Sequence, residues 1–106
     1  MLCNLKSLPV SMRPLVSLKS LSLYECSGIS ALPEWLGDLS SLKSLTISCC
    51  MRIESLPQSI QRLAKLQMLS IVSNKKLKQW CESKKNKKLL AHINNVVSLL
   101  LSCTFT

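Results

Sequence analysis

The stretch LPEWLGDLSSLKSLTISCC, residues 32–50, decides the fold, because its leucines recur at short regular intervals and two cysteines follow directly. Its leucines are Leu32, Leu36, Leu39, Leu42 and Leu45. This spacing is compatible with one amphipathic helix or with one turn of a larger repeat. The rest of the chain distinguishes the two, because a repeat must recur at a fixed period.

Shifting the sequence against itself so that Leu18 falls on Leu42 brings the other leucines into alignment as well. The aligned sets are Leu18, Leu42 and Leu66; Leu21, Leu45 and Leu69; Leu23, Ile47 and Ile71; Cys26, Cys50 and Asn74; Ile29, Ile53 and Leu77; and Leu32, Leu56 and Trp80. The pattern L-x-x-L-x-L-x-x-C/N-x-x-I-x-x-L-P-x-x-L-x-x-L is a leucine-rich repeat of the usual length. We therefore predict an α/β fold, a leucine-rich-repeat solenoid of about three 24-residue coils.

Each part of the repeat has a structural role. The alternating segments 21–23, 45–47 and 69–71 predict short parallel strands on the concave face, each with one side buried. At the ladder position, Cys26, Cys50 and Asn74 are expected to point inward and to donate hydrogen bonds to loop carbonyls. Pro33 and Pro57 are expected to open short helical turns on the convex face.

The repeat divides the chain into three segments. Residues 1–14 read as a partial N-terminal repeat, 15–81 as leucine-rich repeats, and 82–106 as a basic C-terminal cap and tail. Met1 would begin after the strand of its own coil, which would leave the strand at 21–23 without a neighbour. Uncovered strand edges pair with other chains, so we expect the chain to self-associate at that end.

Composition excludes several classes of protein. The N-terminus has no secretory signal pattern, and no apolar run approaches the ~20 residues of a membrane-spanning helix. Six cysteines without an export signal favour packed, reduced thiols and a cytoplasmic location. Cys26, Cys49, Cys50 and Cys81 form no C-x-x-C pair, so no metal site is expected.

Catalytic and cofactor motifs are also missing from the sequence. Gly28 and Gly37 stand alone and form no phosphate-binding loop. The single histidine, His92, lacks a G-x-S-x-G partner motif. We therefore expect neither an enzyme nor a bound cofactor.

Lysines dominate one region of the chain. The formal net charge is +9, and the run NKKLKQWCESKKNKK, residues 74–88, holds half of the basic side chains. Lys84, Lys85, Lys87 and Lys88 could bind the phosphates of nucleic acid or of an anionic membrane surface. Without a base-reading motif or interleaved aromatic residues, a solvated cap is favoured over either partner.

The partner surface of a leucine-rich repeat is expected at the outward strand positions. These are Ser20, Ser22, Tyr24 and Glu25; Ser44, Thr46, Ser48 and Cys49; and Met68, Ser70, Val72 and Ser73. Most are small and hydroxylated, with few of the anchors that dominate binding energy. Three strands at ~4.8 Å give a narrow floor, so we expect part of a recognition surface.

The runs LPEWLGDLSSLKSLTI and IESLPQSIQRLAKLQMLSI, with LKQWCE and LAHI, resemble the C-terminal leucine-rich repeats of plant coiled-coil nucleotide-binding disease-resistance proteins. The likeness covers roughly residues 5 to 93. It implies a role in the defence response, with a pathogen effector, a host target or the receptor's own nucleotide-binding domain as the protein partner. The alternatives are a short intracellular signalling scaffold and an anionic-surface binder acting through the lysines.

Overall fold

The computed structural model describes residues 16–26 and 28–99. Their elements are β1 (Ser20–Tyr24), η2 (Glu34–Asp38), β2 (Ser44–Ser48), η3 (Gln58–Arg62), β3 (Met68–Val72), α1 (Lys75–Glu82), α2 (Lys84–Leu89) and β4 (Asn95–Leu99). The segment 1–14, expected as a partial repeat, and the end of the tail from residue 100 lie outside the described residues.

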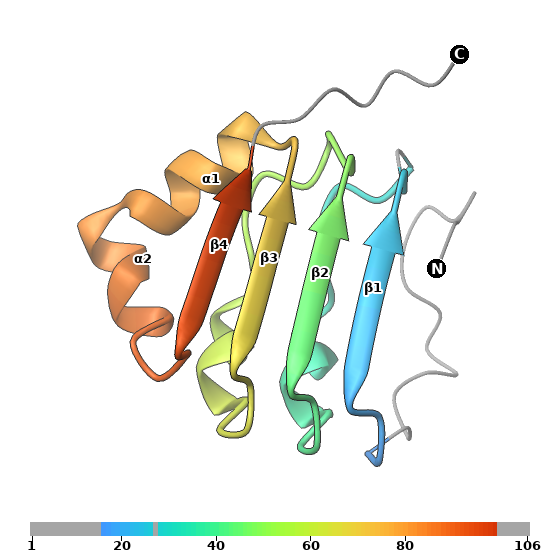
Figure 1. The fold of residues 1–106 in the computed structure, drawn as a ribbon, viewed down its shortest axis with the longest axis vertical. Helices are drawn as coiled ribbons and strands as arrows, with labels where there is room; N and C mark the ends of the chain where they lie inside the picture. Colours follow the sequence, from blue (N-terminus) through green and yellow to red (C-terminus); the bar gives the residue numbers. More distant parts are fainter. Residues whose placement is uncertain (1–15, 27, 100–106) are drawn as a thin grey trace.

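The four strands form one parallel sheet in the order β1-β2-β3-β4 (Figure 1). Leu21 pairs with Leu45, and Leu45 with Leu69, so the register between these strands equals the period of the repeat. The strands expected near 21–23, 45–47 and 69–71 are therefore confirmed. The fourth strand was not predicted.

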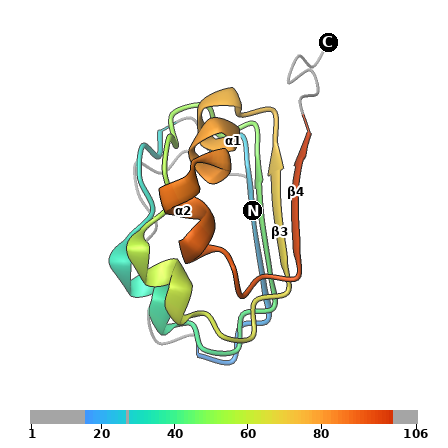
Figure 2. The same cartoon turned by 90° about the vertical axis from the view of Figure 1, so that its left-hand side faces the viewer.

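The helical segments pack on one face of the sheet and leave the other face open (Figure 2). The core lies between these two layers. It is made of columns of leucine and isoleucine that repeat from coil to coil, and most of these side chains are fully buried. The central columns are Leu23, Ile47 and Ile71; Leu36 and Ile60; Leu39 and Leu63; and Leu42 and Leu66.

Buried hydrogen bonds at the ladder position connect successive coils, as predicted for Cys50 and Asn74; the disulfide-bonded sulfur of Cys26 has no proton to donate. Cys50 donates its thiol to the carbonyl oxygen of Leu23, and its Sγ accepts from the backbone N–H of Cys26. One coil later, Asn74 Nδ2 donates to the carbonyl oxygens of Cys50 and Ile53, at 2.8 and 2.5 Å. These donors add buried hydrogen bonds to carbonyl oxygens of the preceding coil.

The short 3₁₀ helices η2 and η3 each begin directly after a proline, Pro33 and Pro57, as predicted. They pack closely against one another because Gly37 has no side chain. A Cβ atom at Gly37 would lie 2.5 Å from the carbonyl oxygen of Ser59. Arg62 also joins the two helices, through an ion pair with Asp38.

The connection after β3 differs from those after β1 and β2 in that Asn74 caps a helix. Its Oδ1 accepts the backbone N–H of Leu77 at 3.0 Å, which is the N-cap bond that cysteine in the earlier coils does not supply. The chain then forms α1 and α2 before it reaches β4. The period of the earlier strands would pair Leu69 with Ile93. Because the connection is longer, Leu69 pairs with Val96 instead. No helix in the described part of the chain has the length and apolar character needed to cross a membrane.

We predict that Asn74→Ala lowers the free energy of unfolding by about 2–3 kcal/mol. The change removes the helix cap and two buried hydrogen bonds to the carbonyl oxygens of Cys50 and Ile53. Urea denaturation followed by circular dichroism measures it, with the exposed Asn94→Ala as the control.

Asn74→Asp keeps the cap acceptor but places a carboxylate against the same two carbonyl oxygens. Burial and these oxygens raise the folded-state pKa of the introduced carboxyl above its unfolded value. The folded variant therefore binds the extra proton more tightly, so its stability falls as the pH rises from about 4 to 8. A flat pH dependence relative to Asn94→Asp would argue against the inward contacts.

We predict that Gly37→Ala destabilises the fold by about 1–3 kcal/mol, because the new methyl group must displace the backbone of Ser59. Gln61 occupies the equivalent place in η3 and is exposed. Gln61→Ala should therefore leave the thermal midpoint unchanged, and equal midpoints for the two variants would contradict the close packing of η2 on η3.

Candidate interaction surface

The open face of the sheet carries three rows of side chains, one from each outward position of the strands. The rows are Ser20, Ser44, Met68 and Asn95; Ser22, Thr46, Ser70 and Val97; and Tyr24, Ser48, Val72 and Leu99. The residues predicted from β1, β2 and β3 thus lie together on one surface. We call this surface the outward face.

The outward face changes in character across the sheet. Its β1 and β2 positions are serine and threonine apart from Tyr24, which is 42% exposed. On β3 and β4 most outward positions are apolar, and Met68, Val97 and Leu99 are exposed. The expectation of a small, hydroxylated floor therefore describes only half of the surface.

The sequence analysis missed the contribution of β4, which adds Asn95, Val97 and Leu99 to this face. A signal for it exists in the sequence. Leu90, Ile93 and Val96 repeat the spacing of Leu63, Leu66 and Leu69, but at a longer interval than the one that separates the earlier coils. A search restricted to a single period could not find it.

The three remaining predicted residues, Glu25, Cys49 and Ser73, lie in turns at the ends of the strands. All three have positive φ angles, of 55°, 58° and 60°. Glu25 is exposed, but Ser73 is only 6% exposed, and its backbone N–H donates to the carbonyl oxygen of Leu99. Ser73 is therefore removed from the predicted partner surface, because the unpredicted strand β4 lies beside it.

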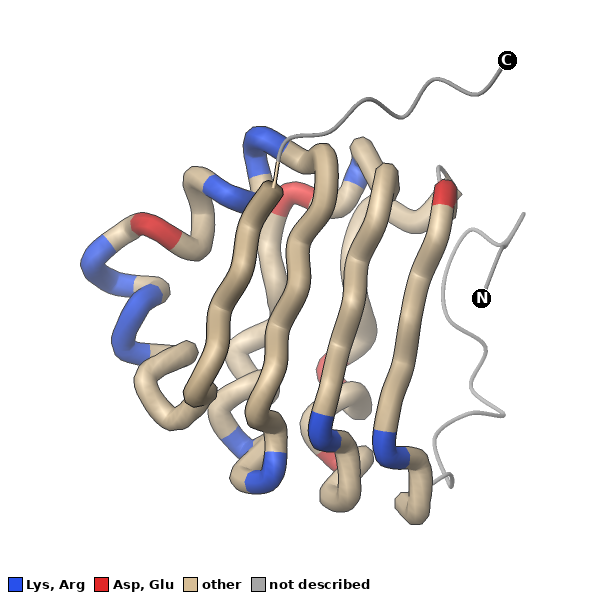
Figure 3. Tube along the Cα trace, in the orientation of Figure 1, with Lys and Arg blue, Asp and Glu red and all other residues tan. Residues whose placement is uncertain are grey.

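No strand position of the outward face is charged, and Figure 3 shows Lys and Arg at the strand starts, in the loops and on the helices. Lys84, Lys85, Lys87 and Lys88 all lie on α2, exposed to solvent. Within the described residues they form no ion pair, whereas Lys76 pairs with Glu54 and Lys78 with Glu82. The lysines of α2 are thus a separate basic surface, away from the outward face.

The cysteines are in two chemical states. Cys26 and Cys49 are disulfide-bonded, so the expectation of reduced thiols is wrong for these two residues. Cys50 and Cys81 are buried free thiols. Burial raises the pKa of Cys50, and it raises the pKa of Cys81 to about 11 with a further contribution from the Glu82 carboxylate. Both free thiols are therefore protonated and weakly nucleophilic at neutral pH.

Metal chemistry finds no support in the described part of the chain, where no three His, Cys, Asp or Glu side chains gather as a possible metal site. His92 is half-buried, and its Nε2 atom has no hydrogen-bond partner among these residues.

Comparison with known proteins identifies the repeat. The family model described as R13L1/DRL21 LRRs matches residues 4–74, which is well over half of the chain. No curated protein matches the sequence. The match covers β1, β2 and β3 and ends before α1, so it includes the coils that share one period. The parallel sheet, the columns of buried leucine and this match together place the chain in the R13L1/DRL21 family of leucine-rich repeats, which is related to plant disease-resistance proteins.

Proposed function

We propose that this chain is a non-enzymatic protein-interaction module that acts in plant defence through the outward face of its sheet. The observation that carries the proposal is the uncharged face of four in-register strands, half hydroxylated and half apolar, within a resistance-type leucine-rich repeat. Its partner is a pathogen effector, a host target or the nucleotide-binding domain of its own receptor.

The chemistry of the outward face supports a protein partner. Tyr24, Met68 and Leu99 are exposed, and aromatic residues and methionine are enriched where proteins meet. The serine and threonine side chains between them offer hydrogen bonds without the desolvation cost of a charge. Such a surface suits a partner that combines apolar and polar groups over a narrow strip.

The proposal includes the wider setting that the resemblance to coiled-coil nucleotide-binding receptors implies. In that setting the sheet is the concave face of a solenoid, and the protein acts in the cytoplasm. The short helices η2 and η3 behind the sheet are compatible with the convex side of such coils. The sequence holds a single histidine, whose Nε2 atom has no hydrogen-bond partner among the described residues, and this favours a module without catalytic activity.

We predict that Thr46→Arg and Ser70→Arg each weaken binding of a true partner by at least about tenfold, because a long charged side chain at the centre of the face blocks contact. Both positions point outward, so the thermal midpoint should not change. The measurement is biolayer interferometry of the immobilised chain against a panel of effectors and nucleotide-binding domains. Gln61→Arg on η3 is the control. A partner that responds to Gln61→Arg but to neither face variant would refute the assignment of this surface.

The exposed lysines of α2 favour a second candidate function, the binding of a polyanion. Lys84, Lys85, Lys87 and Lys88 form no ion pair within the described residues, and α2 buries no side chain. If they bind heparin or anionic vesicles, affinity should fall steeply between about 50 and 200 mM salt through counterion release. Replacing all four by Gln should abolish most of the binding, whereas Lys19, Lys43, Lys65 and Lys75→Gln should retain it. Equal losses in both sets would indicate a dependence on net charge alone.

A further inference from the structure

The edge of the sheet at β4 is open among the described residues, because β4 pairs with β3 and with no other strand there. The consequence is visible in burial. Val96 is 42% exposed, although it lies in register with Leu69, which is fully buried. An inward position of the repeat is thus exposed to solvent at this edge.

The backbone at this edge is oriented to pair with a further strand. The carbonyl oxygen of Leu99 accepts the N–H of Ser73, and the N–H of Asn95 donates to Gln67, so these residues of β4 direct their groups toward β3. In a parallel sheet, alternate residues direct both backbone groups to opposite neighbours. Val96 and Ser98 therefore present their N–H and C=O groups away from β3.

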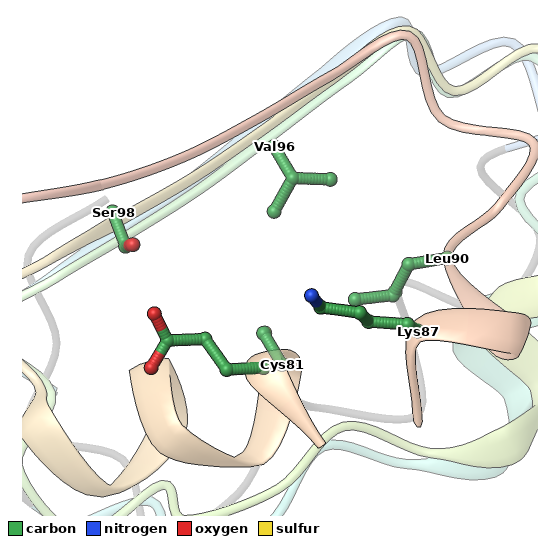
Figure 4. A pocket seen from close by; sticks show the side chains of 6 residues that line it. Cys81, Lys87, Leu90, Val96 and Ser98 are labelled. Atoms are coloured by element: carbon green, nitrogen blue, oxygen red, sulfur yellow. The ribbon is translucent and has the colours of Figure 1, made fainter. Parts of the chain in front are cut away.

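The same two residues line a cavity of about 390 Å³ between β4 and the helices. Figure 4 shows Val96 and Ser98 on the strand facing Cys81, Lys87 and Leu90 on the helical side. Ser98 stands in register with Ile71, so a small polar side chain replaces the isoleucine of the previous coil. The smaller side chains of the fourth coil thus leave space where the core would otherwise continue.

Charge at the cavity favours an acidic partner. Lys87 and Glu82 both line it, and the short helix that carries Lys87 also carries Lys84, Lys85 and Lys88, so positive charge is in excess near the cavity. Glu82 is already paired with Lys78, so its negative charge is partly neutralised.

We propose that the open edge of β4 binds an extended peptide as a fifth strand. Its backbone pairs with Val96 and Ser98, alternate apolar side chains enter the cavity, and flanking acidic residues meet Lys87 and the other lysines of α2. Main-chain pairing of this kind gives affinity, and the pockets for alternate side chains give specificity. The proposal goes beyond the proposed function, because the edge is a different surface from the outward face.

The probe is a fluorescein-labelled synthetic peptide, Asp-Glu-Val-Val-Ile-Val-Thr-Glu-Asp, titrated with the full chain and followed by fluorescence polarisation. We expect saturable binding. Replacing the central Ile by Pro removes a backbone donor, and replacing the acidic flanks by Lys reverses the charge. Both control peptides should bind at least about fivefold more weakly.

Ser98→Pro tests the edge in the protein. The Ser98 N–H points away from β3, so proline there removes no bond of the β3–β4 ladder, while it blocks the added strand. We expect at least about a tenfold loss of peptide affinity with β4 still in place. Lys87→Glu should cost about fivefold, while Thr46→Arg on the outward face should have no effect.

Amide hydrogen exchange of the unmodified chain gives a readout that does not depend on any variant folding. Peptide binding should slow exchange at Val96 and Ser98, and the amides of Val97 and Leu99 should already be slow in the free chain. Unchanged exchange at Val96 and Ser98 in the peptide complex overturns the proposal. Slow exchange at both without peptide, in a chain that sediments as a dimer, also overturns it and assigns the edge to a second copy.

Discussion

Parallel hydrogen bonding between neighbouring strands places each residue of one coil beside its equivalent in the next coil, and the rest of the molecule depends on this register. Leucine then stacks on leucine, which buries continuous columns without any aromatic anchor in the fully buried core. The connections must repeat as well. Each of the first three strands is followed by a residue with positive φ, and the ladder residues Cys50 and Asn74 reach back to carbonyls of the preceding coil. The register also brings the connections close together. A single methyl group at Gly37 would collide with the backbone of Ser59 in the next coil.

The outward face is the part of the sheet that the core does not constrain. Inward positions must be apolar and of similar volume, whereas the outward positions alternate with them and carry no packing requirement. Serine and threonine occupy most of them on β1 and β2, and larger apolar groups most of them on β3 and β4. The charged side chains lie at the strand starts, in the loops and on the helices (Figure 3). An uncharged strip bordered by charged ends is well suited to align an elongated partner along the rows.

The connection from β3 to β4 differs from the connections between the earlier strands. Asn74 keeps the inward hydrogen bonds of the ladder and also caps α1, and the connection that follows is helical and longer than the earlier ones. The core contains less side-chain volume at β4, because Val96 and Ser98 occupy the positions that Leu69 and Ile71 occupy on β3. The smaller side chains leave the cavity seen in Figure 4 beside a basic helix. Asn74 thus has two roles: it continues the ladder of buried hydrogen bonds, and it caps the first helix of the longer connection.

The sequence by itself determined the repeat, the three strands that share its period, the inward positions of Cys26, Cys50 and Asn74, and the side of the sheet that is left uncovered. These features follow from spacing along the chain, because residues that are one period apart in the sequence become neighbours on adjacent strands of an in-register sheet. Tertiary structure alone decided the features that depend on contacts outside that period. The pairing of Leu69 with Val96 set the register of β4, which buried Ser73 and added Val97 and Leu99 to the face. The disulfide bonding of Cys26 and of Cys49 likewise could not be read from the period of the repeat, because it depends on which cysteines the fold brings together.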